Sequence, residues 1–155
     1  ADPLDERSHR LGSMSAASVV DSYVGALPGD TRRLGPGEWG LTLPAEQGGG
    51  WPLDVGLRIA DELLRVQAFA LDADEAINPW NFLHWNRGTR LIRFSCTRAG
   101  DIWVQADLPV TAVDERMVDR LLGLVVEGAV MARSAMAERE EPAAGSGEGW
   151  GAVPR

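Results

Sequence analysis

The sequence predicts an α+β fold, in which a five-stranded antiparallel sheet and three helices follow the order α-β-β-β-α-β-β-α. Residues 51–71 and 91–108 place apolar side chains at alternate positions, which is typical of half-buried strands. Residues 15–27 and 114–138 repeat apolar side chains at helical spacing instead. Because short turns join successive strands, antiparallel pairing is favoured, and helices collected on one face would leave the other face open.

Composition and charge limit the classes of function. The formal net charge of -8 argues against nucleic acid or an anionic membrane as a partner, because both are bound through clustered positive charge. The single cysteine, Cys96, permits no disulfide within the chain and suits a reducing compartment. No apolar run in the sequence reaches the length of a bilayer span. We therefore expect a cytoplasmic protein.

The length of 155 residues suits one domain, which we place at residues 14–138. Residues 1–13 are polar and aperiodic and end in Gly-Ser just before Met14, so they resemble a vector-derived leader. Residues 139–155 are rich in Glu, Pro, Gly and Ala, a composition that predicts a disordered tail.

The first helix is expected over residues 15–27, with Ser15 as its cap. The glycines of residues 35–40 fit the spacing of a dinucleotide-binding turn, but that turn joins a strand to a helix. Here strand-like alternation follows, at residues 39–43, so we expect a turn that feeds a strand and no cofactor. Residues 44–50 are expected to form a flexible loop.

The next two strands form a predicted hairpin. Residues 51–60 give the clearest strand pattern in the chain, and residues 64–71 alternate in the same way after a turn at Asp61-Glu62. A helix over residues 61–71 also fits the pattern. The strong strand directly upstream favours the hairpin.

The segment from Asn78 to Gly88, NPWNFLHWNRG, carries the densest aromatic surface in the chain. Asn78 can cap a short helix, and Gly88 can end it. Because apolar side chains point off several sides of so short a helix, we expect it to be buried between the two strand segments as a structural keystone. The keystone residues are Trp80, Leu83, Trp85, Asn86 and Arg87.

Residues 91–96 and 102–108 predict a second hairpin. Cys96 has the parity of Phe94, so we expect a small core residue rather than a nucleophile. The last helix, over residues 114–138, has a wider apolar stripe than one sheet face requires. Either part of this stripe meets another subunit or the helix lies deep against the sheet, and the pattern leaves both open.

Few residues suggest catalysis. His9 lies in the expected leader, and His84 is expected to be a hydrogen-bonded interior residue. One histidine and one cysteine do not make a metal site, and the sequence has no nucleophile elbow. We therefore expect no enzyme, with no catalytic residue, no cofactor and no metal.

The element order and several motifs point to a known family. The motifs are Leu64-Arg-Val-Gln-Ala68, Phe82-Leu-His-Trp-Asn-Arg87, Arg93-Phe94, Gly100-Asp101 and Ala106-Asp-Leu-Pro109. Together they resemble the YbjN family and its relatives with a type III secretion chaperone-like (Tir chaperone-like) fold, over residues 15–138. The resemblance implies a non-enzymatic, often dimeric module that binds an extended segment of a partner protein.

Three residues are candidates for such binding. Trp103 has the opposite parity to Ile102 and Val104, so it is expected on the open face of the sheet beside Gln105, with Arg93 on the neighbouring strand. Aromatic and arginine side chains are the usual anchors of interfaces. We expect another protein or peptide as the partner, on this face or at a sheet edge, unless a helix or the second subunit of a homodimer covers Trp103.

Two alternatives stay open at this point. One is a small-molecule-sensing domain or an enzyme, with a pocket between the sheet and the central helix around His84. The other is a regulatory protein that acts through protein–protein contacts, which the sequence does not separate from a peptide-binding module.

Overall fold

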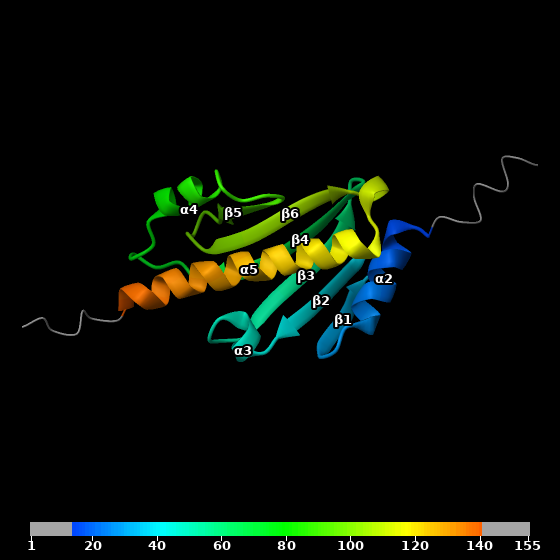
Figure 1. The fold of residues 1–155 in the computed structure, drawn as a ribbon, viewed down its shortest axis with the longest axis horizontal. Helices are drawn as coiled ribbons and strands as arrows, with labels where there is room; N and C mark the ends of the chain where they lie inside the picture. Colours follow the sequence, from blue (N-terminus) through cyan, green and yellow to red (C-terminus); the bar gives the residue numbers. More distant parts are fainter. Residues whose placement is uncertain (1–13, 141–155) are drawn as a thin grey trace, which may run out of the picture.

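The computed structural model describes residues 14–140 (Figure 1). The leader expected at residues 1–13 lies outside the described residues, as does the tail expected at residues 139–155 except for its first two residues, which belong to the last helix. The helices are α2 (Ala16–Ala26), α3 (Ala45–Gly48), α4 (Pro79–Trp85) and α5 (Glu115–Glu140), with a 3-10 turn η1 (Val110–Ala112). The strands are β1 (Asp30–Gly35), β2 (Glu38–Leu43), β3 (Leu53–Ala60), β4 (Leu63–Leu71), β5 (Ile92–Cys96) and β6 (Ile102–Pro109).

The strands form one sheet in the order β1-β2-β3-β4-β6-β5, and every neighbouring pair is antiparallel. The predicted antiparallel α+β fold is confirmed, but the expectation of five strands is wrong because it omits β1. This strand reads DTRRLG, lies at a sheet edge, and is exposed or partly exposed along its whole length. An edge strand with so little burial needs no apolar alternation, so the sequence gives no pattern by which to find it.

The expectation of three helices is also wrong, because α3 is a fourth helix in the described part of the chain. It lies where the sequence predicted a flexible loop. Helix α3 is capped at its C-terminal end by Gly49, whose φ of 84° is a conformation that glycine adopts without strain. A Cβ on Gly48 would lie 3.1 Å from the backbone nitrogen of Leu53, so this segment is closely packed.

Helix α2 begins directly after its predicted cap, Ser15, and α5 begins directly after Asp114, near which its start was predicted. The Ser15 hydroxyl accepts a hydrogen bond from the Ser18 amide at 3.2 Å, and the Asp114 carboxylate accepts one from the Met117 amide at 2.7 Å. Helix α5 continues to Glu140, two residues beyond its predicted end.

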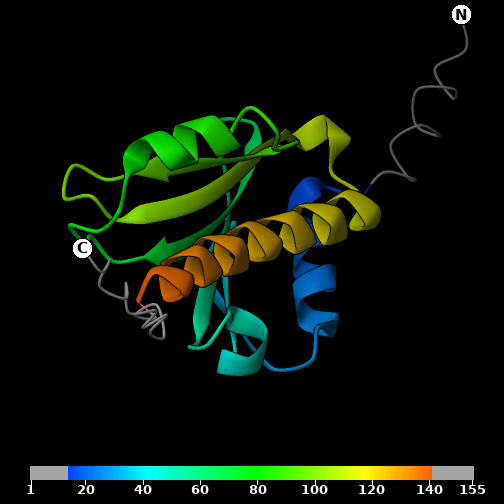
Figure 2. The same ribbon diagram turned by 60° about the vertical axis from the view of Figure 1, so that its left-hand side comes forward.

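Helix α5 lies against one face of the sheet, and the sheet curves around it (Figure 2). Gly128 permits this close approach. A Cβ at that position would lie 2.9 Å from Ile92 Cδ1 and 3.0 Å from Val104 Cγ1. The helix backbone therefore sits almost directly on β5 and β6.

The core lies between α5 and alternate residues of the strands. Buried side chains from the sheet include Leu53, Val55 and Leu57 of β3, Leu64, Val66 and Ala68 of β4, and Ile102, Val104, Ala106 and Leu108 of β6. Helix α5 adds Val118, Leu121, Val125, Ala129 and Ala132. Each fully buried valine or leucine contributes roughly 1.5–3 kcal/mol.

Both predicted hairpins are confirmed, and the alternative of a helix over residues 61–71 is wrong. Strands β3 and β4 pair from Val55 with Ala68 to Ala60 with Leu63. Asp61 and Glu62 form the turn with φ values of 52° and 60°, which are typical of the tight turn that joins twisted strands.

Arg133 is a buried charged residue that ties α5 to the sheet, and it is 2% exposed. Its Nε donates to the Ala70 carbonyl at 2.9 Å, and its Nη1 donates to the carbonyls of Gly48 at 2.7 Å and Trp51 at 2.8 Å. Ala70 lies at a bulge between β4 and β6, where the ladder leaves backbone groups unpaired. Burial lowers the pKa of Arg133, and the ring of Trp51 lies 4.3 Å from its guanidinium carbon.

Replacing Arg133 is expected to destabilise the fold strongly. Arg133→Met keeps most of the apolar stem but leaves several buried carbonyls without a donor, so the free energy of unfolding should fall by about 3 kcal/mol. Urea denaturation measures this change. Arg120→Met, at an exposed position of the same helix, is the matched control and should change stability by less than about 0.5 kcal/mol. Equal effects of the two substitutions would contradict the role of Arg133.

Candidate partner-binding face

The sheet face turned away from the core, here named the open face, is formed by the residues that alternate with the buried ones. It holds the aromatic pair, which consists of Phe69 and Trp103. Beside it lies the glutamine row, Gly56, Gln67, Gln105 and Arg93, and then the charged row, Glu38, Arg58, Arg65 and Asp107. The three residues predicted for partner binding, Trp103, Gln105 and Arg93, therefore lie together on one face.

The aromatic pair presents a fixed apolar surface. Phe69 and Trp103 are register partners on β4 and β6, and both are half-buried. Their ring centroids lie 5.3 Å apart at an interplanar angle of 79°, an edge-to-face arrangement that favours both rings. Each ring holds the other in place while part of its surface stays accessible.

The glutamine row crosses the middle of the open face. Gln105 Nε2 donates to Gln67 Oε1 at 3.3 Å, and Gln105 is the register partner of Arg93. At the other end of the row, a Cβ on Gly56 would meet only Gln67 Cγ, at 4.0 Å. The backbone of β3 is therefore accessible from the open face at Gly56.

The charged row centres on Asp107. Its Oδ1 accepts from Arg65 Nε at 2.8 Å, and its Oδ2 accepts from Arg65 Nη2 at 3.1 Å and from Arg93 Nη2 at 2.6 Å. Arg58 is the register partner of Arg65 and pairs with Glu38 at 3.2 Å. A hollow of about 300 Å³ lies here, lined by Arg58, Ala60, Asp61, Leu63, Arg65, Gln67 and Asp107.

The paired arginines shift the titration of Asp107. The hydrogen bonds from Arg65, supported by those from Arg93, lower its pKa to about 2, against the opposing effect of partial burial. Because the pKa is lower in the folded chain than in the unfolded chain, the pair stabilises the fold above about pH 5. This stabilisation is lost as the pH falls toward 2.

Asp107→Asn should therefore change the acid dependence of stability. The exposed arginines weaken the pair, so the loss at pH 7 is expected to be about 1 kcal/mol. The difference from the unchanged protein should shrink as the pH falls from about 5 to about 2, because the carboxylate becomes protonated there. Urea denaturation at a series of pH values measures this, with the exposed Asp72→Asn as the control. A difference that does not depend on pH would contradict the assignment.

Sequence reasoning missed the other residues of this face, and four of them, Phe69, Gln67, Arg65 and Asp107, surround the predicted three. Asp107 has the parity of Trp103, so the alternation on β6 contains a signal for it. The other three come from β4, which pairs with β6 although the central helix and β5 intervene in the sequence. That pairing cannot be read from local pattern.

The inner side of α4 packs as predicted. The rings of Phe82, Trp85 and Phe94 lie with centroids 5.1 to 5.9 Å apart. Asn86 Oδ1 accepts from the Phe94 amide at 2.7 Å, and Asn86 Nδ2 donates to the Phe94 carbonyl at 3.1 Å. This pair of bonds imitates a strand ladder and fixes the end of the helix to β5.

The outer side of α4 differs from the prediction. Trp80 is 75% exposed and Leu83 is 56% exposed, and Arg87 is exposed as well. The expectation that the helix is buried all round is therefore wrong for these residues. A helix of seven residues packs one side on β5, and within residues 14–140 no element covers its other side.

Two further expectations about single residues are wrong. His84 is exposed rather than interior, because it lies on the outer side of α4 beside Leu83. Cys96 is exposed rather than a core residue, because it is the last residue of the edge strand β5. The small hollow between α4 and α5, about 30 Å³, is lined by residues such as Phe82 and Trp85 but not by His84.

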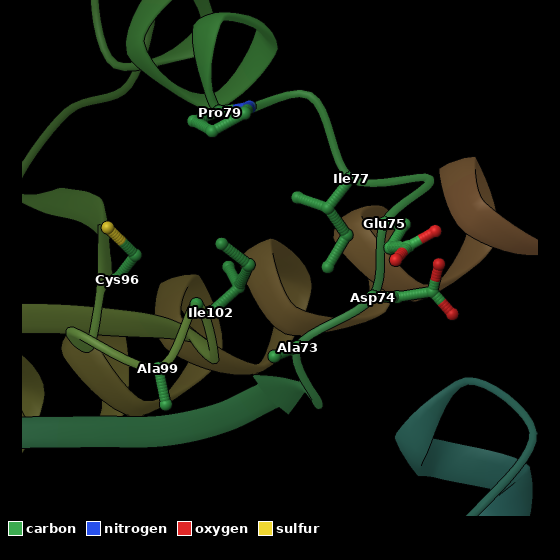
Figure 3. A pocket seen from close by; sticks show the side chains of 9 residues that line it. Ala73, Asp74, Glu75, Ile77, Pro79, Cys96, Ala99 and Ile102 are labelled. Atoms are coloured by element: carbon green, nitrogen blue, oxygen red, sulfur yellow. The ribbon is translucent and has the colours of Figure 1, made fainter.

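A larger hollow of about 390 Å³ lies beside Cys96 (Figure 3). It is lined by Ala73, Asp74, Glu75, Ile77, Pro79, Cys96, Ala99, Gly100 and Ile102. Figure 3 shows Cys96 at one side and the carboxylates of Asp74 and Glu75 at the other, with Ile77 and Ile102 between them. The lining contains no histidine that would serve as a base for the thiol.

The described part of the chain contains no group of three or more His, Cys, Asp or Glu side chains placed to hold a metal ion. Nor does any helix in residues 14–140 combine the length and apolar character needed to cross a bilayer.

Comparison with known families identifies the chain. The model of the YbjN family, described as a putative bacterial sensory transduction regulator, matches residues 52–138, which is more than half of the sequence. The chain belongs to the YbjN family. The predicted resemblance is thereby confirmed, and the match spans the sheet from β3 to β6 together with α4 and most of α5. No curated protein matches the chain.

Solved structures share the fold of this YbjN-family chain at low sequence identity. YbjN from E. coli, called a putative transcription regulator, is 14% identical with a TM-score of 0.59, covering 80% of this chain and 96% of that one. The Yersinia pestis type III secretion chaperone SycH, in complex with a fragment of YscM2, is 17% identical with a TM-score of 0.56, covering 76% and 99%. The HopA1–SchA chaperone-effector complex has a sequence identity of 12% and a TM-score of 0.57, and the match covers 76% of this chain and 91% of that one. The type III secretion chaperone-like fold is thus confirmed.

Proposed function

We propose that this YbjN-family chain is a non-enzymatic, chaperone-like protein-binding module that acts in the cytoplasm. It holds an extended segment of a partner protein on the open face of its sheet. The observation that carries the proposal is the partly exposed Trp103, placed beside Gln105 and Arg93 on a face that α5 does not cover.

The chemistry of the open face suits recognition of a peptide. Aromatic and arginine side chains account for much of the binding energy in protein interfaces. The glutamine amides supply donors and acceptors for a peptide backbone, and the aromatic pair supplies apolar area. Six paired strands and the core against α5 hold these groups rigidly, so little conformational entropy is lost on binding.

The structural neighbours support a partner protein rather than a small ligand. The structure of SycH contains a stable fragment of YscM2, and that of SchA contains the effector HopA1. The family description points toward regulation. A regulatory protein that acts by holding a partner segment agrees with both the partner-bound neighbours and the family description. The alternative pocket around His84 has no support, since that side chain is exposed.

Trp103→Ala is the direct test. It removes the ring that anchors the partner, so affinity for the bound segment should fall about tenfold or more. The full-length chain is used to recover partner proteins from its own cells, the protected segment is mapped by proteolysis, and its dissociation constant is measured by calorimetry. The control is Met131→Ala, at an exposed position of α5 that lies outside both the open face and the outer side of α4. If both variants bind the segment as tightly as the unchanged protein, the proposed function is wrong.

We also propose that the chain forms a homodimer through the outer side of α4. Trp80 and Leu83 lie one helical turn apart and form an exposed apolar surface beside the edge strand β5. Large apolar side chains at this exposure are typical of a surface that is covered in solution.

The double substitution Trp80→Glu, Leu83→Glu should convert a dimer into a monomer, because it places two like charges in the contact from each subunit. Sedimentation velocity measures the change in mass. Met131→Glu, at a 42% exposed position of α5, is the matched control. A dimer that survives the double substitution, or dissociates with Met131→Glu, would contradict α4 as the interface.

A further inference from the structure

We propose that the open face selects a partner segment in which apolar and acidic side chains alternate. This inference rests on the proposed function and adds the chemistry of the partner. The segment lies over the glutamine row, with its apolar side chains toward the aromatic pair and its carboxylates toward the charged row.

The spacing of the three rows suits an extended peptide whose side chains alternate between two directions. Trp103 and Asp107 are four residues apart on β6 with the glutamine row between them, which corresponds to about 13 Å along the strand. The side chains of an extended peptide leave its backbone in opposite directions at successive residues. A backbone centred on the glutamine row therefore directs one set of side chains to each flanking row.

The surface along the glutamine row can bind a peptide backbone. Gly56 leaves the backbone of β3 uncovered, and a glycine inside a strand often marks the close approach of another chain. The bond between Gln105 and Gln67 uses one amide hydrogen and one acceptor position, so both side chains retain donor or acceptor capacity. From Gly56 to Arg93 the row crosses four strands, about 14 Å, which matches four to five extended residues.

The arginines of the charged row, together with Arg93, favour a partner segment that carries carboxylates. One carboxylate, Asp107, is shared by Arg65 and Arg93, and these three contacts use three of the ten N–H donors that two guanidinium groups carry. Arg58 faces Arg65 across the strands, at the distance where like charges repel each other. A carboxylate from the partner would relieve this repulsion, whereas a lysine would increase it.

The charges in and beside the charged row balance each other, although the chain is acidic overall. Three arginines, Arg58, Arg65 and Arg93, stand against three carboxylates, Glu38, Asp107 and Asp61, the last at the turn end of the hollow. The net charge of the whole chain is -8. Because salt screens charges beyond about 8–10 Å, the acidic residues elsewhere in the chain oppose a bound carboxylate only weakly, and the unused N–H donors of Arg65 and Arg93 bind it.

The test compares four ten-residue peptides on the full-length chain by fluorescence polarisation. The first alternates leucine and glutamate, the second has the same composition in two blocks, the third alternates leucine and glutamine, and the fourth alternates leucine and lysine. The block peptide has the same net charge as the first, so it separates the pattern from bulk electrostatics. Protein variants are Arg93→Gln and Arg58→Gln, with Arg98→Gln, exposed in the β5–β6 turn, as the control.

We expect the alternating leucine–glutamate peptide to bind at least tenfold more tightly than each of the other three. Arg93→Gln and Arg58→Gln should each weaken it at least threefold, and Arg98→Gln should leave it unchanged. Equal binding of the block or glutamine peptide, or no binding of the first peptide, overturns the inference. In that case the proposed function still stands if a native partner segment binds and depends on Trp103, and falls with the inference if it does not.

Discussion

The packing of α5 against a single face of the sheet is the constraint on which the rest of the structure depends. Successive side chains of a strand point to opposite faces, so the burial of Val55, Val66 and Val104 under α5 turns their neighbours outward. The aromatic pair and the charged row occupy the open face for this reason. The same residues that build the core thus define the surface available to a partner.

Arg133 makes this packing specific rather than merely apolar. Its guanidinium reaches the carbonyls of α3, of the segment that leads into β3, and of the bulge in β4. Because a buried guanidinium must be satisfied by several acceptors, α5 is fixed in one register along the sheet. The ladder between β4 and β6 then places Phe69 opposite Trp103 on the face that α5 leaves open.

The sequence predicted the parts of this fold that follow a local period. The alternation on β3 and β6 and the stripe on α5 are strong because those elements are half-buried along their length. It failed at β1 and α3, where short polar or glycine-rich segments carry no period. It also failed for Trp80 and His84, because an aromatic cluster shows that some rings are buried without showing which side of α4 faces the core. Trp103, Gln105 and Arg93 were placed correctly by parity, whereas their neighbours on β4 required the sheet order.

The central claim is that a partner segment lies on the open face. Site-specific photo-crosslinking in the cells that make the protein tests it most directly. A photoreactive side chain at Gln105, on the open face, should form crosslinks that mass spectrometry maps to one contiguous segment of one partner. The same group at Arg120, on the exposed side of α5, should give none of these crosslinks. Crosslinks to the partner from position 120 and none from position 105 would contradict the account.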